Sequence, residues 1–305
     1  MIFDPSSPVI VQGIKEPLGM TYAPLMKAYG TPVIAGVSPG YGGERLAGIP
    51  VYDMVEQVVA SHGAIATVVI CSHPYAALDA ALEAMRVGVR QIVLISQGVP
   101  PLDMVKLLRH AETTETLVVG PNGPGVIVPG KLLLGIHPPA FYQPGSVGLI
   151  TRNGPLTYEV ARLLTQAGIG QSIGVSIGSD AIVGSTFPQW LQILEEDDET
   201  EAIVLVGEIG GDSEEMAAHY IAEAIDKPVV AYIAGHTAPR NRRIGHAGAI
   251  IESQILDLGP DIGTAESKVA AFRRAGIPVA ERLSMIPTLV QQVLNQTLSS
   301  KLQAS

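Results

Sequence analysis

Cysteine, basic residues and long apolar runs are scarce in this sequence of 305 residues, and each scarcity excludes a class of protein. The single cysteine, Cys71, cannot form an internal disulfide or a cysteine-based zinc site, and we expect it to be buried in a strand. The formal net charge of −10 argues against general binding to nucleic-acid phosphates. No apolar stretch approaches the roughly 18 residues of a membrane span, and the N-terminal residues lack the features of a signal peptide. We therefore expect a soluble, cytoplasmic protein that binds neither nucleic acid nor membranes.

Apolar residues are plentiful. Hydrophobic residues make up 47% of the chain and charged residues 16%, which suits two ordinary domains with substantial cores. Short apolar runs alternate with segments of helical period, as in α/β proteins whose parallel sheets are covered on both faces. In the first half we expect strands at residues 8–13, 32–37, 66–71, 91–96 and 116–119, and helices at residues 20–29, 53–61, 76–86 and 102–111.

The second half repeats this rhythm after a passage that is dense in glycine and proline. That passage indicates a packed inter-domain connection at residues 126–145. We therefore predict two α/β domains, at residues 1–125 and 146–305. In the second we expect a helix from Leu156 onward, capped by Asn153, and strands at residues 146–151, 174–177, 202–207, 228–234 and 277–280.

The first predicted strand leads into a turn at Gly13, and Gly19 lies close to the start of the following helix. Doubly wound folds hold phosphate at such a turn, although this glycine spacing is not that of the dinucleotide fingerprint. A site for NAD also needs an acid at the end of the second strand, and none occurs before Glu44. A dinucleotide oxidoreductase is therefore disfavoured, whereas a ligand with its own ribose phosphate, such as CoA, is compatible with the missing acid.

His246 stands between glycines after a stretch that contains three arginines, so the backbone beside it can approach a ligand closely. A histidine nitrogen can act as a nucleophile, and a carboxylate that accepts from the other ring nitrogen fixes the tautomer this requires. Glu208, at the end of an apolar strand, is the candidate carboxylate. The helix N-terminus at Asn153 and Gly154 offers N–H groups suited to an anion. Together these residues suggest phosphoryl transfer, and an ordinary loop histidine is the alternative.

The segment Gly170-Gln-Ser172-Ile-Gly174 matches the GxSxG pattern of serine hydrolases. A nucleophile elbow follows a strand and begins a helix. This segment is predicted to follow a helix and enter a strand, so we reject a serine hydrolase.

A set of motifs extends over nearly the whole chain. They include Gly36-Val-Ser-Pro-Gly40, Gly120-Pro-Asn122, Leu156-Thr-Tyr-Glu159, Gly207-Glu-Ile-Gly-Gly211, Lys227-Pro-Val-Val230 and Gly245-His-Ala-Gly-Ala-Ile-Ile251. In these motifs the sequence resembles the alpha subunits of the succinyl-CoA synthetase family, within the NDP-forming acyl-CoA synthetase superfamily. The resemblance implies a Rossmann-like CoA-binding domain followed by a flavodoxin-like ligase domain, both with parallel sheets. It also implies a succinate–CoA ligase of the tricarboxylic acid cycle that works through acyl phosphate and phosphohistidine.

The resemblance also implies roles for individual residues. His246 carries the phosphoryl group, Glu208 orients it, Asn153 and Gly154 help to hold phosphate, and Tyr158 lies near the acyl substrate. No residue of this chain is implied to bind a resident metal. The residues implied for the CoA site are Gly13, Lys15, Glu16, Pro17, Leu18, Gly19, Pro39, Tyr41, Ser96, Gln97 and Gly98.

The family's nucleotide site lies on an ATP-grasp beta subunit, and this sequence contains no Walker-type loop. The resemblance therefore implies an assembly with a beta subunit, either a heterodimer or a dimer of heterodimers. It places Mg²⁺ with ATP or GTP mainly on that subunit, and a small carboxylic acid and CoA as the other ligands.

The departures from the family cluster where CoA is expected. Lys15-Glu-Pro-Leu-Gly19 replaces a Thr-Gly-x-x-Gly loop, and Pro17 has no N–H to donate. Tyr41 replaces a lysine, for which Lys15 is a candidate substitute, and Asn153-Gly154-Pro155 replaces Ser-Gly-Thr. A divergent CoA-binding or regulatory paralogue with weak or no ligase activity is therefore the main alternative, and the acid is succinate, malate or another dicarboxylate.

Overall fold

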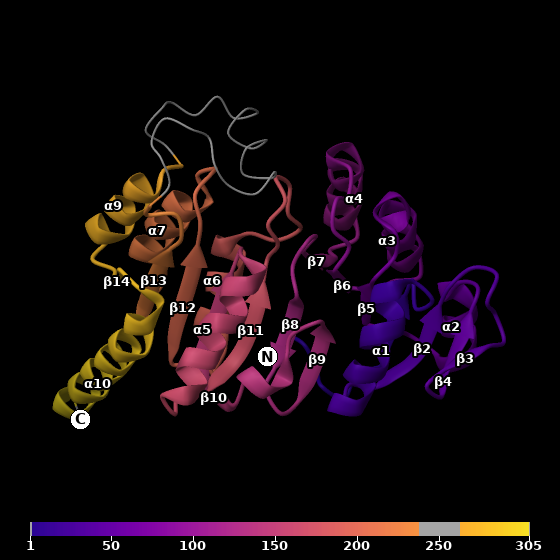
Figure 1. Cartoon of the computed structure of the whole chain (residues 1–305), viewed down its shortest axis with the longest axis horizontal. Helices are drawn as coiled ribbons and strands as arrows, with labels where there is room; N and C mark the ends of the chain where they lie inside the picture. The colour runs from indigo at the N-terminus through magenta and orange to yellow at the C-terminus, as the bar shows by residue number, and fades with distance from the viewer. Residues whose placement is uncertain (1, 238–262, 305) are drawn as a thin grey trace. The chain divides into compact units, whose positions relative to one another are not determined.

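The computed structural model describes residues 2–237 and 263–304, and the chain divides into two compact units. The N-terminal unit comprises residues 2–137 together with residues 182–185. The C-terminal unit comprises residues 138–181 and the described residues from 186 onward. Each unit is built on its own sheet of mostly parallel strands with helices around it (Figure 1).

The N-terminal unit contains a seven-stranded sheet in the order β3-β4-β2-β1-β5-β6-β7. Every neighbouring pair is parallel except β3 with β4, which form a short antiparallel hairpin at one edge. All residues of the central strands β1 and β5 are buried, as expected for a sheet covered on both faces. The strands are β1 (Val9–Gln12), β2 (Val33–Val37), β3 (Arg45–Leu46), β4 (Ile49–Tyr52), β5 (Thr67–Ile70), β6 (Gln91–Leu94) and β7 (Leu117–Val119).

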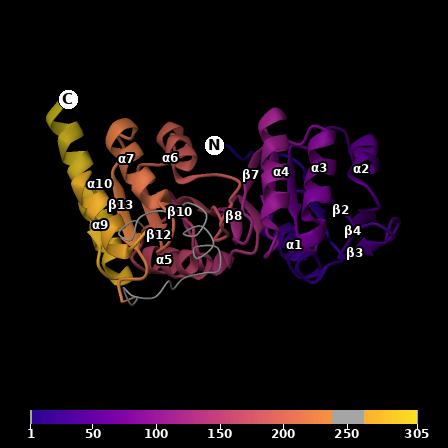
Figure 2. The ribbon, with the colours of Figure 1, turned by 90° about the horizontal axis from the view of Figure 1, so that it is seen from above.

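Helices cover both faces of this sheet, with α1 on one face and α2, α3 and α4 on the other (Figure 2). In α3, Ala77, Ala81, Ala84 and Met85 form the buried stripe, and the small residues let the helix approach the sheet closely. The helices are α1 (Pro17–Tyr29), α2 (Val55–His62), the 3₁₀ turn η1 (Pro74–Ala76), α3 (Ala77–Arg86) and α4 (Pro101–Thr113).

A hairpin completes the N-terminal unit, formed by the antiparallel strands β8 (Gly125–Val128) and β9 (Leu132–Gly135). The Thr31 hydroxyl donates to the Leu133 carbonyl over 2.8 Å, and the Tyr29 hydroxyl accepts from the Gly130 N–H over 2.7 Å. The glycine- and proline-rich passage at residues 126–145 therefore contains ordered strands that pack on α1.

The C-terminal unit has five parallel strands in the order β14-β13-β12-β10-β11. Helix α5 lies on one face of this sheet and α6 and α7 on the other (Figure 2), while α10 packs on α5 and α9 on α7. The strands are β10 (Pro144–Thr151), β11 (Gln171–Ser176), β12 (Ala202–Gly207), β13 (Val229–Ile233) and β14 (Val279–Ala280). The helices are η2 (Pro139–Phe141), α5 (Gly154–Gln166), α6 (Phe187–Glu196), α7 (Ser213–Ala224), α9 (Ala265–Arg274), η3 (Leu283–Met285) and α10 (Ile286–Ala304).

The predicted α/β fold is confirmed, and most predicted strands differ from the observed ones by one or two residues. Two starts differ by three residues: α1 begins at Pro17 because proline suits the first helical turn, and β11 begins at Gln171. Ser172 therefore lies inside a strand, buried and hydrogen-bonded to Thr200 over 2.7 Å, which agrees with the rejection of a hydrolase elbow.

Cys71 is buried, as predicted, but it directly follows β5 and does not lie within the strand. Within the described part of the chain, no helix combines the length and the apolar composition needed to cross a membrane.

Candidate functional site

The carboxyl ends of β1, β2, β5 and β6 meet at one edge of the N-terminal sheet because these strands are parallel neighbours. The residues that follow the strands therefore share this edge: Gly13 after β1, Pro39 near the end of β2, Ser72 near the end of β5 and Ser96 near the end of β6. In open α/β sheets, ligands bind outside this edge.

Gly13 and Gly19 let the turn after β1 pack without side chains. Gly13 has φ +72°, and a Cβ on it would lie 2.6 Å from the Ser72 backbone nitrogen. A Cβ on Gly19 would lie 2.2 Å from the Gly13 carbonyl oxygen. The first turn of α1 thus rests directly on the turn that precedes it. Glu16 is the N-cap, Pro17 follows it, and both are exposed, whereas Leu18 is half-buried.

Lys15 joins this turn to the loop after β2. Its ammonium lies 2.5 Å from a Glu44 carboxylate oxygen and 5.2 Å from the centre of the Tyr41 ring. The Lys15 side chain is 19% exposed, against 52% for Glu44, so the cation is partly shielded while its partner faces solvent. The structure therefore places a positive charge beside Tyr41, where the resemblance implies a phosphate partner.

Asp53, which was not predicted as a site residue, fixes the loop that contains Pro39 and Tyr41. One of its carboxylate oxygens accepts from the Gly40 N–H over 2.7 Å and from the Gly42 N–H over 3.0 Å. A Cβ on Gly42 would lie 2.3 Å from the other oxygen. The signal that could have indicated this role is a carboxylate just before α2 that follows a loop rich in glycine.

Ser96 links the loop after β6 to the loop after β5. Its hydroxyl donates to the Ser72 carbonyl over 2.5 Å, and Ser72 itself abuts Gly13. Gln97 and Gly98 follow and are exposed. The predicted CoA residues in these loops are thus assembled at one edge from three separate parts of the sequence.

The C-terminal sheet has a corresponding edge, where β10 and β12 end side by side. Asn153 follows β10 and caps α5, since its side-chain oxygen accepts from the Leu156 N–H over 3.0 Å. Its side-chain nitrogen donates to the Glu208 carboxylate over 2.7 Å. Both side chains are buried, with exposed fractions of 8% and 5%. The structure therefore brings together two of the residues predicted for phosphoryl transfer and places both beside the N-terminus of α5 and Gly154.

His246 lies outside the described residues. The described residues on both sides of the segment that contains His246 are nevertheless hydrogen-bonded next to Glu208. The Ala234 N–H donates to the Gly207 carbonyl over 2.9 Å, and the Gly210 N–H donates to the Gly263 carbonyl over 2.8 Å. The residues on either side of the segment that carries His246 are thus bonded to the chain immediately around Glu208.

Tyr158 lies on the second turn of α5 and is half-buried. Its phenol is near Tyr142: burial, and then the charge of Tyr158, raise the pKa of Tyr142 well above its usual value. The structure therefore associates Tyr158 with a second tyrosine that sequence reasoning had not singled out.

Comparison with known proteins assigns both units. The family model described as the CoA binding domain matches residues 4–98, and the model described as CoA-ligase matches residues 150–277. The "Succinate--CoA ligase [ADP-forming] subunit alpha 2" of Archaeoglobus fulgidus is 45% identical over 294 residues, which cover 96% of this chain and 99% of that protein. The chain belongs to the succinate–CoA ligase alpha-subunit family.

One relative is named for a different acid. The "Malate--CoA ligase subunit alpha" of Methylorubrum extorquens is 41% identical over 298 residues, covering 96% of this chain and 98% of that protein. Among solved structures, ATP citrate lyase from Methanothrix soehngenii, in complex with citrate and coenzyme A, has a TM-score of 0.85 at 23% identity. That similarity covers 99% of this chain but 52% of the lyase chain, so this chain spans about half of its length and shares its fold.

Each matched range contains the residues predicted for one of the two sheet edges. The CoA-binding match contains every residue predicted to contact CoA, from Gly13 to Gly98. The CoA-ligase match contains Asn153, Glu208 and His246. The chain is therefore a CoA ligase subunit with CoA as a substrate.

Proposed function

We propose that this chain is the alpha subunit of a succinate–CoA ligase in which His246 is transiently phosphorylated. The observation that carries the proposal is the hydrogen bond between Asn153 and Glu208 at the N-terminus of α5. It joins a carboxylate to an anion-binding helix end, and the chain that leads to and from His246 is bonded to the residues beside that carboxylate.

The proposed reaction has three transfers. A nitrogen of His246 attacks the γ-phosphorus of the nucleoside triphosphate, and the nucleoside diphosphate leaves. A carboxylate oxygen of the acid then attacks the same phosphorus, and the bond from nitrogen to phosphorus breaks to give an acyl phosphate. Finally, the CoA sulfur attacks the acyl carbon after its thiol proton is lost, and inorganic phosphate leaves. Covalent catalysis thus divides one difficult step into easier ones.

Glu208 suits the task of orienting the histidine. Its carboxylate is buried and is held by the Asn153 amide, so it has little freedom to turn. A carboxylate that accepts from one ring nitrogen keeps the other nitrogen unprotonated and ready to attack. The N–H of Gly154 and the dipole of α5 supply the positive end for a phosphate, since Pro155 has no N–H and the Leu156 N–H donates to the Asn153 cap.

CoA is proposed to bind at the edge of the N-terminal sheet through backbone N–H groups of the α1 turn and through Lys15. The Gly13–Gly19 packing sets the N-terminus of α1 directly on the turn after β1, and Lys15 is the cation bordered by Tyr41 and Glu44. The changed loop thus retains a phosphate partner at a different position in the sequence.

A beta subunit is the proposed partner, and it carries most of the site for nucleotide and Mg²⁺. Relatives named as ADP-forming support ATP as the nucleotide. Succinate is the proposed acid because most of the named relatives are succinate ligases, and malate is the alternative supported by one of them.

The proposal is tested by co-expressing the chain with the beta subunit from the same source and incubating the complex with γ-labelled ATP. We expect an acid-labile, base-stable label on this chain that succinate plus CoA discharges. The label should be absent in His246→Ala. Discharge by malate but not succinate would reassign the acid.

An assembled complex that takes up no label would overturn the phosphohistidine mechanism. CoA binding in the same preparation, measured by calorimetry, would then support the alternative of a divergent CoA-binding paralogue. Loss of both label and CoA binding would exclude that alternative as well.

A further inference from the structure

Three charged side chains lie buried beneath the loop of residues 208–211, and the proposed chemistry uses none of them. Glu214 and Lys268 are fully buried, and Arg152 is 4% exposed. They come from three parts of the C-terminal unit: Arg152 follows β10, Glu214 lies in the first turn of α7, and Lys268 lies in the first turn of α9. Isolated charges are costly to bury, so three together indicate a specific arrangement.

Glu214 connects this group to Glu208. One Glu214 carboxylate oxygen accepts from the Glu208 backbone N–H over 3.0 Å. The other contacts the Lys268 ammonium and lies 3.5 Å from the Arg152 guanidinium. Burial alone would raise the pKa of Glu214, but Lys268 and Arg152 hold it below its usual value, so the acceptor stays ionised.

The two cations hold the other side of the loop. Lys268 donates to the Gly211 carbonyl over 2.9 Å, and Arg152 donates to the Gly210 carbonyl over 3.3 Å. The main chain of the loop is therefore bound through its N–H at one end and its carbonyls at the other. All three anchors are charged, and hydrogen bonds to charged groups are the stronger ones.

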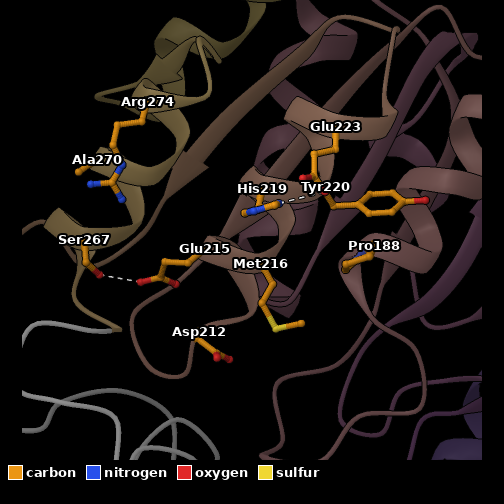
Figure 3. Close-up of a pocket in the computed structure, with 10 residues that line it drawn as sticks. All are labelled: Pro188, Asp212, Glu215, Met216, His219, Tyr220, Glu223, Ser267, Ala270 and Arg274. Carbon is orange, nitrogen blue, oxygen red and sulfur yellow. Dashed lines mark hydrogen bonds and ion pairs between the residues drawn. The ribbon is translucent and has the colours of Figure 1, made fainter.

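Glu215 extends the group to the start of α9. One of its oxygens accepts from Lys268 over 3.0 Å, and the other accepts from the Gly263 N–H over 3.2 Å and from the Ser267 hydroxyl over 2.6 Å. Figure 3 shows Glu215 and Ser267 hydrogen-bonded to each other, and both line a pocket of about 750 Å³. Lys268 and the half-buried Glu215 thus connect the chain at Gly263 to the loop that contains Glu208.

We propose that Glu214, Lys268 and Arg152 are positioning residues, which hold the main chain of Glu208 so that its carboxylate keeps its place beside Asn153. The carboxylate is fixed from one side by the Asn153 amide, and the backbone from the other side by Glu214. Removal of either side takes away one of these two restraints on Glu208. The role of these residues in phosphoryl transfer rests on the function proposed above.

Lys268→Met is the informative variant, because methionine matches the length of the lysine stem but donates no hydrogen bond. Lys268→Arg keeps the positive charge, so it should retain much of the labelling rate that Lys268→Met loses. Lys227→Met is the matched control. Lys227 also donates to two backbone carbonyls, those of Leu194 and Asp197, over 2.8 and 2.7 Å, in part-buried hydrogen bonds, but it lies before β13 at the opposite edge of the sheet.

Two measurements on the assembled complex separate positioning from stability. The first is the single-turnover rate of labelling by γ-labelled ATP, with the KM for CoA measured alongside. The second is amide hydrogen exchange of the peptide containing Glu208, compared with a peptide from β10. For Lys268→Met we expect labelling at least tenfold slower, an unchanged KM for CoA, and faster exchange at Glu208 but not in β10. For Lys227→Met we expect a lower melting temperature with both measurements unchanged.

The outcomes are distinguishable. A labelled wild type with equally fast labelling in Lys268→Met, or with equal slowing in both methionine variants, overturns the positioning role and leaves the proposed function intact. An unlabelled wild type overturns the proposed function, and with it the role in phosphoryl transfer. Unchanged exchange at Glu208 in Lys268→Met overturns the structural claim whatever the activity.

Discussion

The side-chain amide of Asn153 donates to the Glu208 carboxylate over 2.7 Å while its oxygen accepts from the Leu156 N–H over 3.0 Å. One residue therefore caps α5 and restrains the carboxylate at the predicted site of phosphoryl transfer. Capping needs only the oxygen, whereas the contact with Glu208 needs the nitrogen, so substitutions can separate the two roles.

Asn153→Asp keeps the acceptor for the helix but places a second carboxylate against Glu208. We expect a folded protein with an intact α5, in which labelling of the complex by γ-labelled ATP slows at least tenfold because two like charges repel. Asn153→Ala removes both roles and should also lower the free energy of unfolding by about 1 kcal/mol. Chemical denaturation and labelling rates measure the two effects. Normal labelling in Asn153→Asp would show that the contact with Glu208 is not needed.

Substitutions at Lys15 and Glu44 are expected to change the KM for CoA in opposite directions. Lys15→Met should raise the KM for CoA roughly tenfold because a charged hydrogen bond to phosphate is lost. Glu44→Gln should lower that KM because it frees Lys15 from the carboxylate 2.5 Å away, at little cost in stability for so exposed a partner. Initial rates at varied CoA concentration measure both.

Lys106→Met is the control for this pair, since Lys106 is an exposed lysine on α4 that also pairs with an acid, Asp103. It should leave the KM for CoA unchanged. An equal rise of the KM for CoA in Lys106→Met and Lys15→Met would mean that the loss of one positive charge, at either position, causes the rise. An unchanged KM in both Lys15→Met and Glu44→Gln would mean that Lys15 does not contact CoA.

The alternation of apolar strands and helical segments predicted the fold well because parallel strands buried on both faces leave a strong sequence pattern. The hairpin of β8 and β9 was not predicted, since its glycines and prolines resemble those of a linker. Its strands are held by contacts distant in sequence, such as Thr31 with Leu133. Local patterns do not reveal such contacts.

The same limit applies to the sites. Glu208 and Asn153 were predicted from strand and helix ends and from the family resemblance, and they prove to be hydrogen-bonded. Asp53, Glu214 and Lys268 were not predicted. Each reads as an ordinary helix-start acid or a solvated lysine, and its role depends on loops that only the tertiary structure brings to it.

Cys71 should be inert to thiol reagents in the folded protein. Burial raises the pKa of its thiol to about 12, so almost no reactive thiolate forms at neutral pH, and the side chain is 3% exposed. We expect no labelling by iodoacetamide in native buffer and one label per chain in denaturant, counted by mass spectrometry. Rapid native labelling would contradict the buried placement after β5.

The buried His137 should make the folded protein less stable in mild acid. Burial lowers the pKa of its imidazole from 6.5 to about 4, against a smaller opposing hydrogen bond with the Gly125 backbone. Between these two values the unfolded chain binds a proton that the folded chain does not, so the stabilising effect of the neutral ring is present above pH 6.5 and is lost as the pH falls toward 4. The free energy of unfolding should therefore drop by about 3 kcal/mol from this group alone.

His137→Gln isolates that contribution because glutamine keeps a polar side chain but does not titrate. The acidic residues titrate in both proteins, so their effects cancel in the difference between the two curves. We expect the variant to be less stable than the wild type at neutral pH and to lose about 3 kcal/mol less on acidification, as measured by urea denaturation across the pH range. Parallel curves for the two proteins would mean that His137 is protonated equally in the folded and unfolded chains, and that the buried ring is accommodated as a cation.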